Sequence, residues 1–228
     1  MTRSKITRRT PGICALALLA STVGHVAGCG ASGAMAYFMG VGRGTKIKPQ
    51  FTLPEGKILV LVDDPGEKVH WPRARGLLGQ YVGEELLTHK AASAMISPES
   101  VAKFRQMNPS FEKYSAQAIG RKLGADAILW LEVRDFFAPT EIQDTSVAAR
   151  MTISLKVLNV HEEQDRGKVR LWPVDRDGYV VESELKAVEV NRLKGKNAAS
   201  KELARKAALY IGRLFYQHTL GDIDDAGE

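Results

Sequence analysis

The sequence predicts a single α/β domain with a mixed central sheet, and three patterns indicate it. Unbroken apolar runs at residues 58–62 and 127–133 are typical of central strands that are covered on both faces. Between these runs, apolar residues recur at helical spacing from Ala74 to Leu86. Residues 147–157 instead carry an apolar residue at every odd position, as in a long strand with one covered face. Strands of both kinds, interleaved with amphipathic helices, predict helices layered on a sheet.

The first part of the predicted domain alternates strands and helices. After the first strand, a helix is expected to begin near Pro72, because proline is favoured in the first helical turn. A short strand is predicted at residues 94–96. Residues 97–99 then place a capping serine, a proline and an acid in the order that starts a helix. A further helix after Pro109 should end at Gly124, since glycine is favoured just after helix C-termini.

The second part is dominated by strands. Beyond the two long strands, short strands separated by turns are predicted at residues 169–174, 179–181 and 185–190. A closing helix should begin at Asn197 and place its apolar residues on one side. The expected organisation is a signal peptide at 1–28, a lipidated cysteine and Gly/Pro tether at 29–55, the α/β domain at 56–218 and an acidic tail at 219–228.

The first 28 residues are typical of a secretory signal. Residues 1–12 are cationic and carry no acid, whereas residues 13–28 form an apolar stretch. This stretch is shorter than the roughly 20 apolar residues that a membrane-spanning helix needs. Val26-Ala27-Gly28-Cys29 resembles the bacterial lipobox, in which small residues precede a cysteine that is acylated before cleavage. The resemblance implies that Cys29 becomes the lipidated first residue; the alternatives are an uncleaved signal anchor or a chance cysteine after a conventional cleavage site.

Acylation of Cys29 leads to an expectation about location. Two or three acyl chains, palmitate among them, anchor a protein stably, whereas a single chain is marginal. Gly30 follows the cysteine, and in enterobacteria an aspartate at that position would retain the protein in the inner membrane. We therefore expect a lipid-anchored protein of the bacterial cell envelope that faces the periplasm, with the outer membrane favoured.

Residues 30–56 are predicted to be a tether between the lipid and the domain. They contain six glycines as well as Pro49 and Pro54, a composition typical of flexible or extended linkers. The glycine-rich run at residues 40–46 has a superficial likeness to a phosphate-binding loop. It lacks the spacing of that loop and leads to Pro49 instead of a helix, so a linker is favoured.

Charge and cysteine content exclude several classes of protein. The formal charge is +6, but residues 1–28 hold four basic residues and no acid, which leaves 28 basic against 26 acidic residues in the rest of the chain. A net charge of +2 gives no whole-molecule attraction for nucleic acid. Cys14 would leave with the signal peptide and Cys29 would carry lipid, so disulfides, thiol catalysis and cysteine–metal sites are not expected.

Several segments carry a resemblance to a group of envelope proteins. The run KILVLV leads to a long helix, SPESVAKF opens the next helix, residues 123–126 introduce a central strand, and Gly167 to Val169 lead to Trp172. Over roughly residues 56–216 this arrangement is similar to the group of the curli-secretion channel lipoprotein and the penicillin-binding-protein activator lipoproteins. It also resembles the amino-terminal domain of the Tol–Pal translocation protein. The resemblance implies a non-enzymatic protein that binds or assembles with other proteins, with no catalytic residues and no cofactor.

Two short segments are candidates for chemistry or binding. Asp63 and Asp64 follow the first strand, where α/β folds place ligands, and two carboxylates there could hold a divalent cation. Solvated turn residues before Pro65 are the favoured alternative. His70 and Trp71 form the exposed pair best suited to face a partner, although they could also pack against the start of the helix.

Metal and hydrolase sites are not expected. His70, His89, His161 and His218 are widely scattered and form no pair at i, i+4, so zinc is not predicted. The sequence has no Gly-x-Ser-x-Gly motif of a serine hydrolase. Seven basic residues concentrate in residues 186–206 and could bind anionic lipid or a cell-wall polymer, with a solvated helix face as the favoured alternative.

The sequence thus predicts a membrane-anchored envelope lipoprotein that acts as a non-enzymatic protein-binding or assembly factor. The membrane, through acylated Cys29, and an envelope protein are the expected partners; the oligomeric state is not predicted. The alternatives are an anionic-lipid or glycan-binding module that uses residues 186–206 and, less favoured, an envelope enzyme near Asp63 and Asp64.

Overall fold

The computed structural model describes residues 45–140, 148–162 and 166–219, so the predicted signal peptide, Cys29 and most of the predicted acidic tail lie outside the described residues. Residues Ile47–His218 form one compact unit. The compact unit combines a mixed sheet with helices, which confirms the predicted α/β class.

The elements follow the predicted order closely. The strands are β1 (Lys46–Ile47), β2 (Lys57–Asp63), β3 (Ala94–Met95), β4 (Ala127–Phe137), β5 (Ala149–Asn159), β6 (Arg170–Trp172), β7 (Tyr179–Leu185) and β8 (His218–Thr219). The helices are α2 (Arg73–Thr88), α3 (Pro98–Met107), α4 (Ala116–Leu123), α5 (Arg166–Val169), α6 (Ala187–Arg192) and α7 (Ala198–Arg213), with a 3₁₀ turn, η1, at Phe111–Lys113.

The main sheet is mixed because its two halves are connected differently. Its strand order is β3-β2-β4-β5-β6, and β7 also pairs with β5, while β1 and β8 pair only with each other. β2 runs parallel to β3 and β4, since helical segments connect these strands. β4, β5, β6 and β7 pair antiparallel. The carboxyl ends of β2 and β4 therefore point to the same edge of the sheet.

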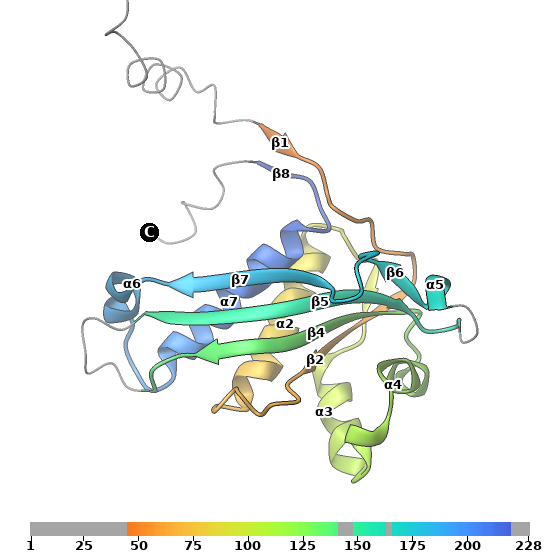
Figure 1. Cartoon of the computed structure of the whole chain (residues 1–228), viewed down its shortest axis with the longest axis horizontal. Coiled ribbons are helices and arrows are strands. Elements are labelled where there is room, and N and C mark those ends of the chain that lie inside the picture. The colour runs from red at the N-terminus through yellow and green to blue at the C-terminus, as the bar shows by residue number, and fades with distance from the viewer. Residues whose placement is uncertain (1–44, 141–147, 163–165, 220–228) are drawn as a thin grey trace, which may run out of the picture. The chain divides into compact units, whose positions relative to one another are not determined.

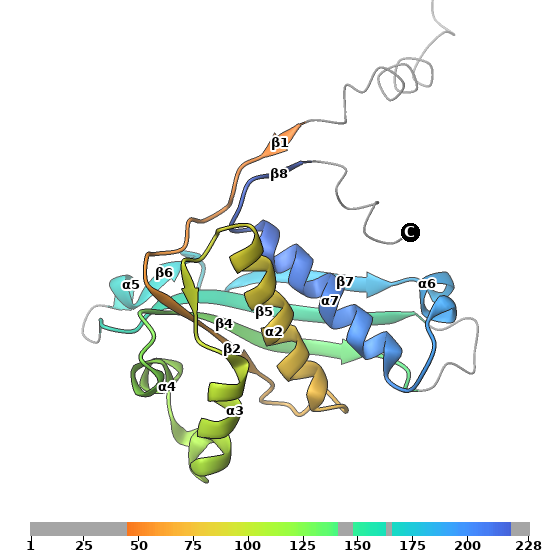
Figure 2. The ribbon, with the colours of Figure 1, turned by 180° about the vertical axis from the view of Figure 1, so that it is seen from behind.

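Helices cover the two faces of the sheet unequally. α2 and α7 pack side by side over one face and enclose the larger core, which contains Val60, Leu129, Leu155, Leu203 and Ile211 (Figure 2). On the other face, α3, η1 and α4 cover a smaller core around Leu59, Ile128 and Val160. Over the remaining length of β4, β5 and β7, no described helix lies on this second face (Figure 1).

Local sequence explains how the helices of the smaller layer begin and end. The hydroxyl of Ser97 accepts a hydrogen bond from Ser100 N at 3.3 Å, and that of Ser115 accepts one from Ala118 N at 3.2 Å. Both serines thus cap the free N–H groups of a first helical turn. Gly124 ends α4 with φ +72°, a left-handed conformation that glycine adopts without strain.

Three segments differ from the expectations drawn from the sequence. The strand predicted at residues 185–190 was wrong, because β7 ends at Leu185 and α6 begins at Ala187, where Lys186 N donates to Glu189 Oε2 at 2.7 Å. Arg166–Val169, which lead into the strand predicted at residues 169–174, form the short helix α5. Within the segment expected to be tether, Leu53 is buried in the larger core, and Gln50 N and Phe51 N both donate to Leu214 O.

Candidate functional site

Two adjoining hollows lie at the carboxyl end of β2. The first, which we call the apolar hollow, has a volume of about 350 Å³, and its apolar wall is formed mainly by Leu61, Phe111, Ile119, Trp130 and Leu158. The second, the polar hollow, has a volume of about 720 Å³ and is lined by charged side chains and the 64–72 loop. Asp63, Arg105 and Glu112 line both hollows, so the two are continuous.

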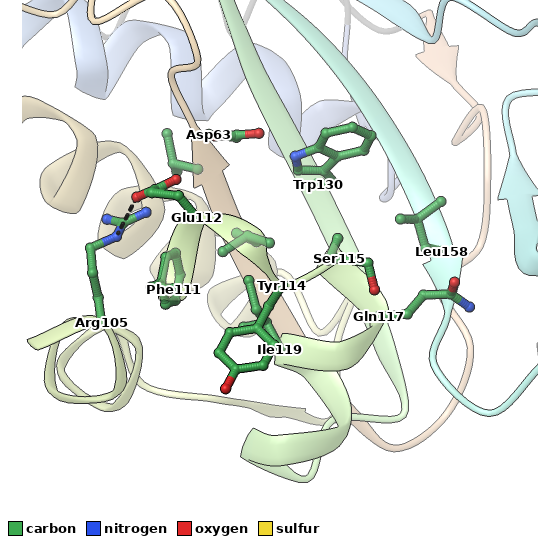
Figure 3. Close-up of a pocket in the computed structure, with 13 residues that line it drawn as sticks. Asp63, Arg105, Phe111, Glu112, Tyr114, Ser115, Gln117, Ile119, Trp130 and Leu158 are labelled. Atoms are coloured by element: carbon green, nitrogen blue, oxygen red, sulfur yellow. Dashed lines mark ion pairs between the residues drawn. The ribbon is translucent and has the colours of Figure 1, made fainter. Parts of the chain in front are cut away.

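The apolar hollow forms because side chains alternate along the strands. Leu61 on β2 and Trp130 on β4 face the side of the sheet that carries α3, η1 and α4. Phe111 in η1 and Ile119 in α4 close the hollow from the helical layer, and both are buried. Figure 3 shows Trp130 and Leu158 on one side of the hollow and the Arg105–Glu112 pair on the other.

Arg105 is held loosely between the two hollows. Its Nε lies 3.6 Å from Glu112 Oε1, beyond hydrogen-bond distance, and its guanidinium carbon lies 4.4 Å from the centre of the Phe111 ring. Burial lowers the pKa of Arg105, and the attraction of Glu112 opposes this while the nearby positive charge of Arg75 adds to it. Because the Nε atoms of Arg75 and Arg105 have no hydrogen-bond acceptor among the described residues, a neutral acceptor such as a carbonyl group would be favourable here.

Asp63 and Arg75 bring unpartnered charge to the polar hollow. Asp63 is half-buried, and within the described ranges its carboxylate forms no hydrogen bond or ion pair. The Nε of Arg75 is buried and likewise has no hydrogen-bond partner in the part of the chain that the structure describes. A negative and a positive side chain are therefore available to a ligand.

The two aspartates singled out in the sequence have different surroundings. Asp64 is 6% exposed, and its carboxylate accepts hydrogen bonds from Lys68 N at 2.9 Å and Val69 N at 3.0 Å. Both carboxylate oxygens of Asp64 thus stabilise the 64–69 turn, which matches the turn alternative for this residue. Asp63 lines both hollows, whereas Asp64 lines only the polar hollow. No cluster of three or more His, Cys, Asp or Glu side chains suited to a metal ion occurs among the described residues.

The fold places the two residues of the predicted partner-binding pair, His70 and Trp71, in different surroundings. His70 is exposed and lines the polar hollow, whereas Trp71 is partly buried and packs against the larger core. His70 and Asp63 thus line the same hollow. The fold places Trp71 where it supports the start of α2.

The basic stretch at 186–206 is partly neutralised by neighbouring acids. Arg205 makes a bidentate contact with Glu202, and Lys206 Nζ donates to Glu189 Oε1 at 3.0 Å. Burial raises the pKa of Glu189, but hydrogen bonds from Lys186 N and Lys206 outweigh it and leave the pKa below its usual value. The other basic side chains are exposed: Lys186, Arg192, Lys194, Lys196 and Lys201.

A second polar cluster lies between α2 and the end of α7 and lines neither hollow. The Tyr216 hydroxyl donates to Glu85 Oε1, and the ring of His89 stacks on Tyr216 with centroids 3.9 Å apart. Burial, and then the contact with Glu85, raise the pKa of Tyr216 well above its usual value. This cluster joins the two helices of the larger layer.

Reasoning from the sequence missed most of the side chains that line the hollows. Arg75, Arg105 and Glu112 are ordinary surface residues by sequence and come from three different elements. Trp130 was recognised only as part of a buried strand, yet it is half-exposed. Trp130 is the one aromatic residue among the mostly aliphatic residues 127–133, and this was the hint that its position differs.

None of the described helices combines the length and apolar character that crossing a membrane requires. Comparison with protein-family models and with curated proteins finds no match.

Solved structures match over most of the chain at low similarity. A PelC dodecamer from Paraburkholderia phytofirmans is 13% identical, with a TM-score of 0.39 and coverage of 76% of this chain and 97% of that one. The lipoprotein GNA1162 from Neisseria meningitidis is 14% identical, with a TM-score of 0.38 and coverage of 70% and 99%. The hypothetical protein CT253 from Chlamydia trachomatis is 11% identical, with a TM-score of 0.38 and coverage of 71% and 98%. One of these neighbours is a lipoprotein.

Proposed function

We propose that this chain is an envelope lipoprotein, anchored through acylated Cys29, whose α/β domain binds a protein partner without catalysing a reaction. The observation that carries the proposal is the lipobox-like segment 26–29 behind a cationic and then apolar leader. The likeness of residues 56–216 to the curli-secretion, penicillin-binding-protein activator and Tol–Pal group supports a binding role. Facing the periplasm, with the outer membrane favoured, is part of the same proposal.

The uncovered part of the sheet supports binding of a protein. Phe137 on β4 and Val180 on β7 are 48% and 52% exposed on the face that the described helices leave open. Charged side chains surround them, among them Arg150, which donates to Asp135 Oδ2 at 2.9 Å. Apolar and aromatic side chains within a charged surround are typical of protein-binding surfaces.

The predicted tether sets how far the domain can reach. Residues 47–55 belong to the compact unit, so only residues 30–46 remain as a connection, and most of them lie outside the described residues. At full extension a segment of this length spans at most about 60 Å. A partner must therefore lie in the membrane or close to its surface.

The proposal is tested by photo-crosslinking the full-length protein in intact cells. A photoreactive amino acid replaces Val180 on the open face or, as a control, Leu87, which is 45% exposed on α2. We expect a discrete protein adduct from position 180 and not from position 87. The adduct should disappear when Cys29→Ser prevents anchoring. Failure to obtain an adduct from position 180, or an unchanged adduct in the Cys29→Ser protein, would contradict the proposal.

A second candidate function is binding of anionic lipid or glycan through residues 186–206, favoured by the five exposed basic side chains there. Full-length Cys29→Ser protein, which has no acyl anchor but keeps the cationic residues 1–28, is compared with the same protein in which Lys194 and Lys196 are replaced by Glu. Salt-sensitive binding to phosphatidylglycerol vesicles that weakens with these replacements would support the basic stretch as the site. The protein-binding proposal predicts equal vesicle binding by the two proteins.

A further inference from the structure

We infer that the apolar and polar hollows together bind an extended segment of the partner protein, with a large apolar side chain in the first hollow and a lysine or arginine beside it in the second. This inference rests on the proposed function, because it names a docking site and its chemistry for the same partner.

The apolar hollow has the size and lining of a side-chain pocket. Its volume of about 350 Å³ is at the small end of the range of about 300–1,000 Å³ that ligand pockets occupy. Leu61, Phe111, Ile119 and Leu158 are buried beneath it, and the half-exposed indole of Trp130 forms its outer wall. An aliphatic or aromatic side chain would lose its contact with water there, which is the main source of favourable free energy for an apolar group.

The charge balance of the polar hollow favours a basic side chain. Four carboxylates line it against two guanidinium groups, and Asp64 is already hydrogen-bonded within its turn. Within the described residues the Asp63 carboxylate has no hydrogen bond or ion pair, only a longer-range attraction to Arg105. The Glu112 side chain is 76% exposed, and its contact with Arg105 is long, at 3.6 Å. A lysine or arginine placed beside Asp63 would form the charge-assisted hydrogen bond that this carboxylate lacks.

The arginines favour a peptide over a small amine. Arg75 has no acceptor within the described ranges, and Arg105 has only the long contact with Glu112. The backbone carbonyl groups of an extended segment supply acceptors for such donors, whereas a simple amine supplies none. The continuity of the two hollows through Asp63, Arg105 and Glu112 also fits a ligand that extends past one pocket.

The test uses full-length protein in detergent and three fluorescein-labelled peptides with Gly-Ser flanks. Their central residues are Lys-Leu-Arg, Glu-Leu-Glu or Lys-Ala-Arg, and binding is measured by fluorescence polarisation. We expect Lys-Leu-Arg to bind about tenfold or more tightly than either of the others, since one lacks the charge and the other the apolar side chain. Equal binding of all three peptides, or none by any, would overturn the inference.

Two substitutions locate the site. Asp63→Asn removes the unpartnered carboxylate, and Ala116→Phe fills the apolar hollow from its lining at the start of α4. Each should weaken Lys-Leu-Arg binding about tenfold or more, whereas Glu84→Gln on the exposed side of α2, which lines neither hollow, should not change it. Thermal unfolding of each variant shows whether it is folded. Unchanged binding in both folded site variants would overturn the inference, as would full displacement of the peptide by phenethylamine.

The crosslinking and peptide-binding experiments together distinguish a failure of this inference from a failure of the proposed function. If the adduct from position 180 forms in wild-type cells and persists in the Asp63→Asn and Ala116→Phe proteins, a partner binds but not at the hollows. If the peptides behave as expected while Cys29 carries no lipid, the hollows bind peptide but the anchoring part of the proposed function is wrong.

Discussion

Asp126 shows how a single side chain joins distant parts of this chain. Its Oδ2 accepts a hydrogen bond from Lys57 N at 2.8 Å, and its Oδ1 lies 3.1 Å from His161 Nε2. Its own N–H donates to Lys57 O, so the start of β2 and the approach to β4 are held together. The hydrogen bond from Lys57 N is the largest of the effects that lower the pKa of Asp126 below 3.8.

Asp126→Asn should therefore reduce the acid sensitivity of the fold. A carboxylate whose pKa is lower in the folded than in the unfolded state contributes stability above pH 3.8, and this contribution is lost as the pH falls through the folded-state value. Urea unfolding at pH 6 and pH 3 should show that wild type loses more stability between these values than Asp126→Asn. Equal losses in the two proteins would contradict this account.

Tyr216 leads to the opposite prediction at alkaline pH. Its raised pKa means that the contribution of Tyr216 is fully present below pH 10 and is lost as the pH rises above that value. The free energy of unfolding of Tyr216→Phe should thus fall less steeply between pH 10 and pH 11.5 than that of wild type. At pH 7 the same variant should be about 1–3 kcal/mol less stable, because Glu85 loses its hydrogen bond. Denaturant titrations at pH 7 and across the alkaline range measure both effects. If the free energy of unfolding of the variant fell with pH as steeply as that of wild type, Tyr216 would not be the cause of the alkaline loss of stability.

At the scale of the elements, periodicity was a good guide because it is a local property. The spacing in residues 74–86, the alternation in 147–157 and the cap at Ser97 each specify structure without reference to the rest of the chain. The prediction of a strand at residues 185–190 was wrong because the spacing of their apolar residues also suits a strand. The hydrogen bond from Lys186 N to Glu189 there stabilises a helix start instead.

The packing of α4 against the sheet can be tested with two glycines. A Cβ at Gly120 would lie 2.7 Å from Ile128 Cδ1 and 2.9 Å from Val160 Cγ2, whereas a Cβ at Gly76 in α2 would meet nothing within 4 Å. Gly120→Ala should destabilise the protein by about 1–3 kcal/mol through overpacking. Gly76→Ala should stabilise it by about 0.5–1 kcal/mol through helix propensity. Urea unfolding of both variants compares them, and similar stabilities would show that α4 does not pack as described.

At the scale of the whole molecule, the candidate site was only partly predictable. The position of Asp63 after a buried strand indicated where a ligand could bind, because the connectivity of an α/β fold places sites there. Arg75 and Arg105 reach the same hollow from α2 and α3, and Glu112 reaches it from η1. No spacing in the sequence marks these three residues as neighbours, since their proximity depends on how α3 and η1 pack on the sheet.

The central claim is that acylation of Cys29 places this domain at a membrane, and the intact mass of the full-length protein tests it most directly. Wild type and Cys29→Ala are expressed in a bacterial host, purified from detergent extracts of whole cells, and their intact masses are measured by mass spectrometry. The account predicts that wild type loses residues 1–28 and gains the mass of two or three acyl chains, while Cys29→Ala keeps its full N-terminus. A wild-type mass with an intact N-terminus, or with an unmodified cysteine, would contradict the account.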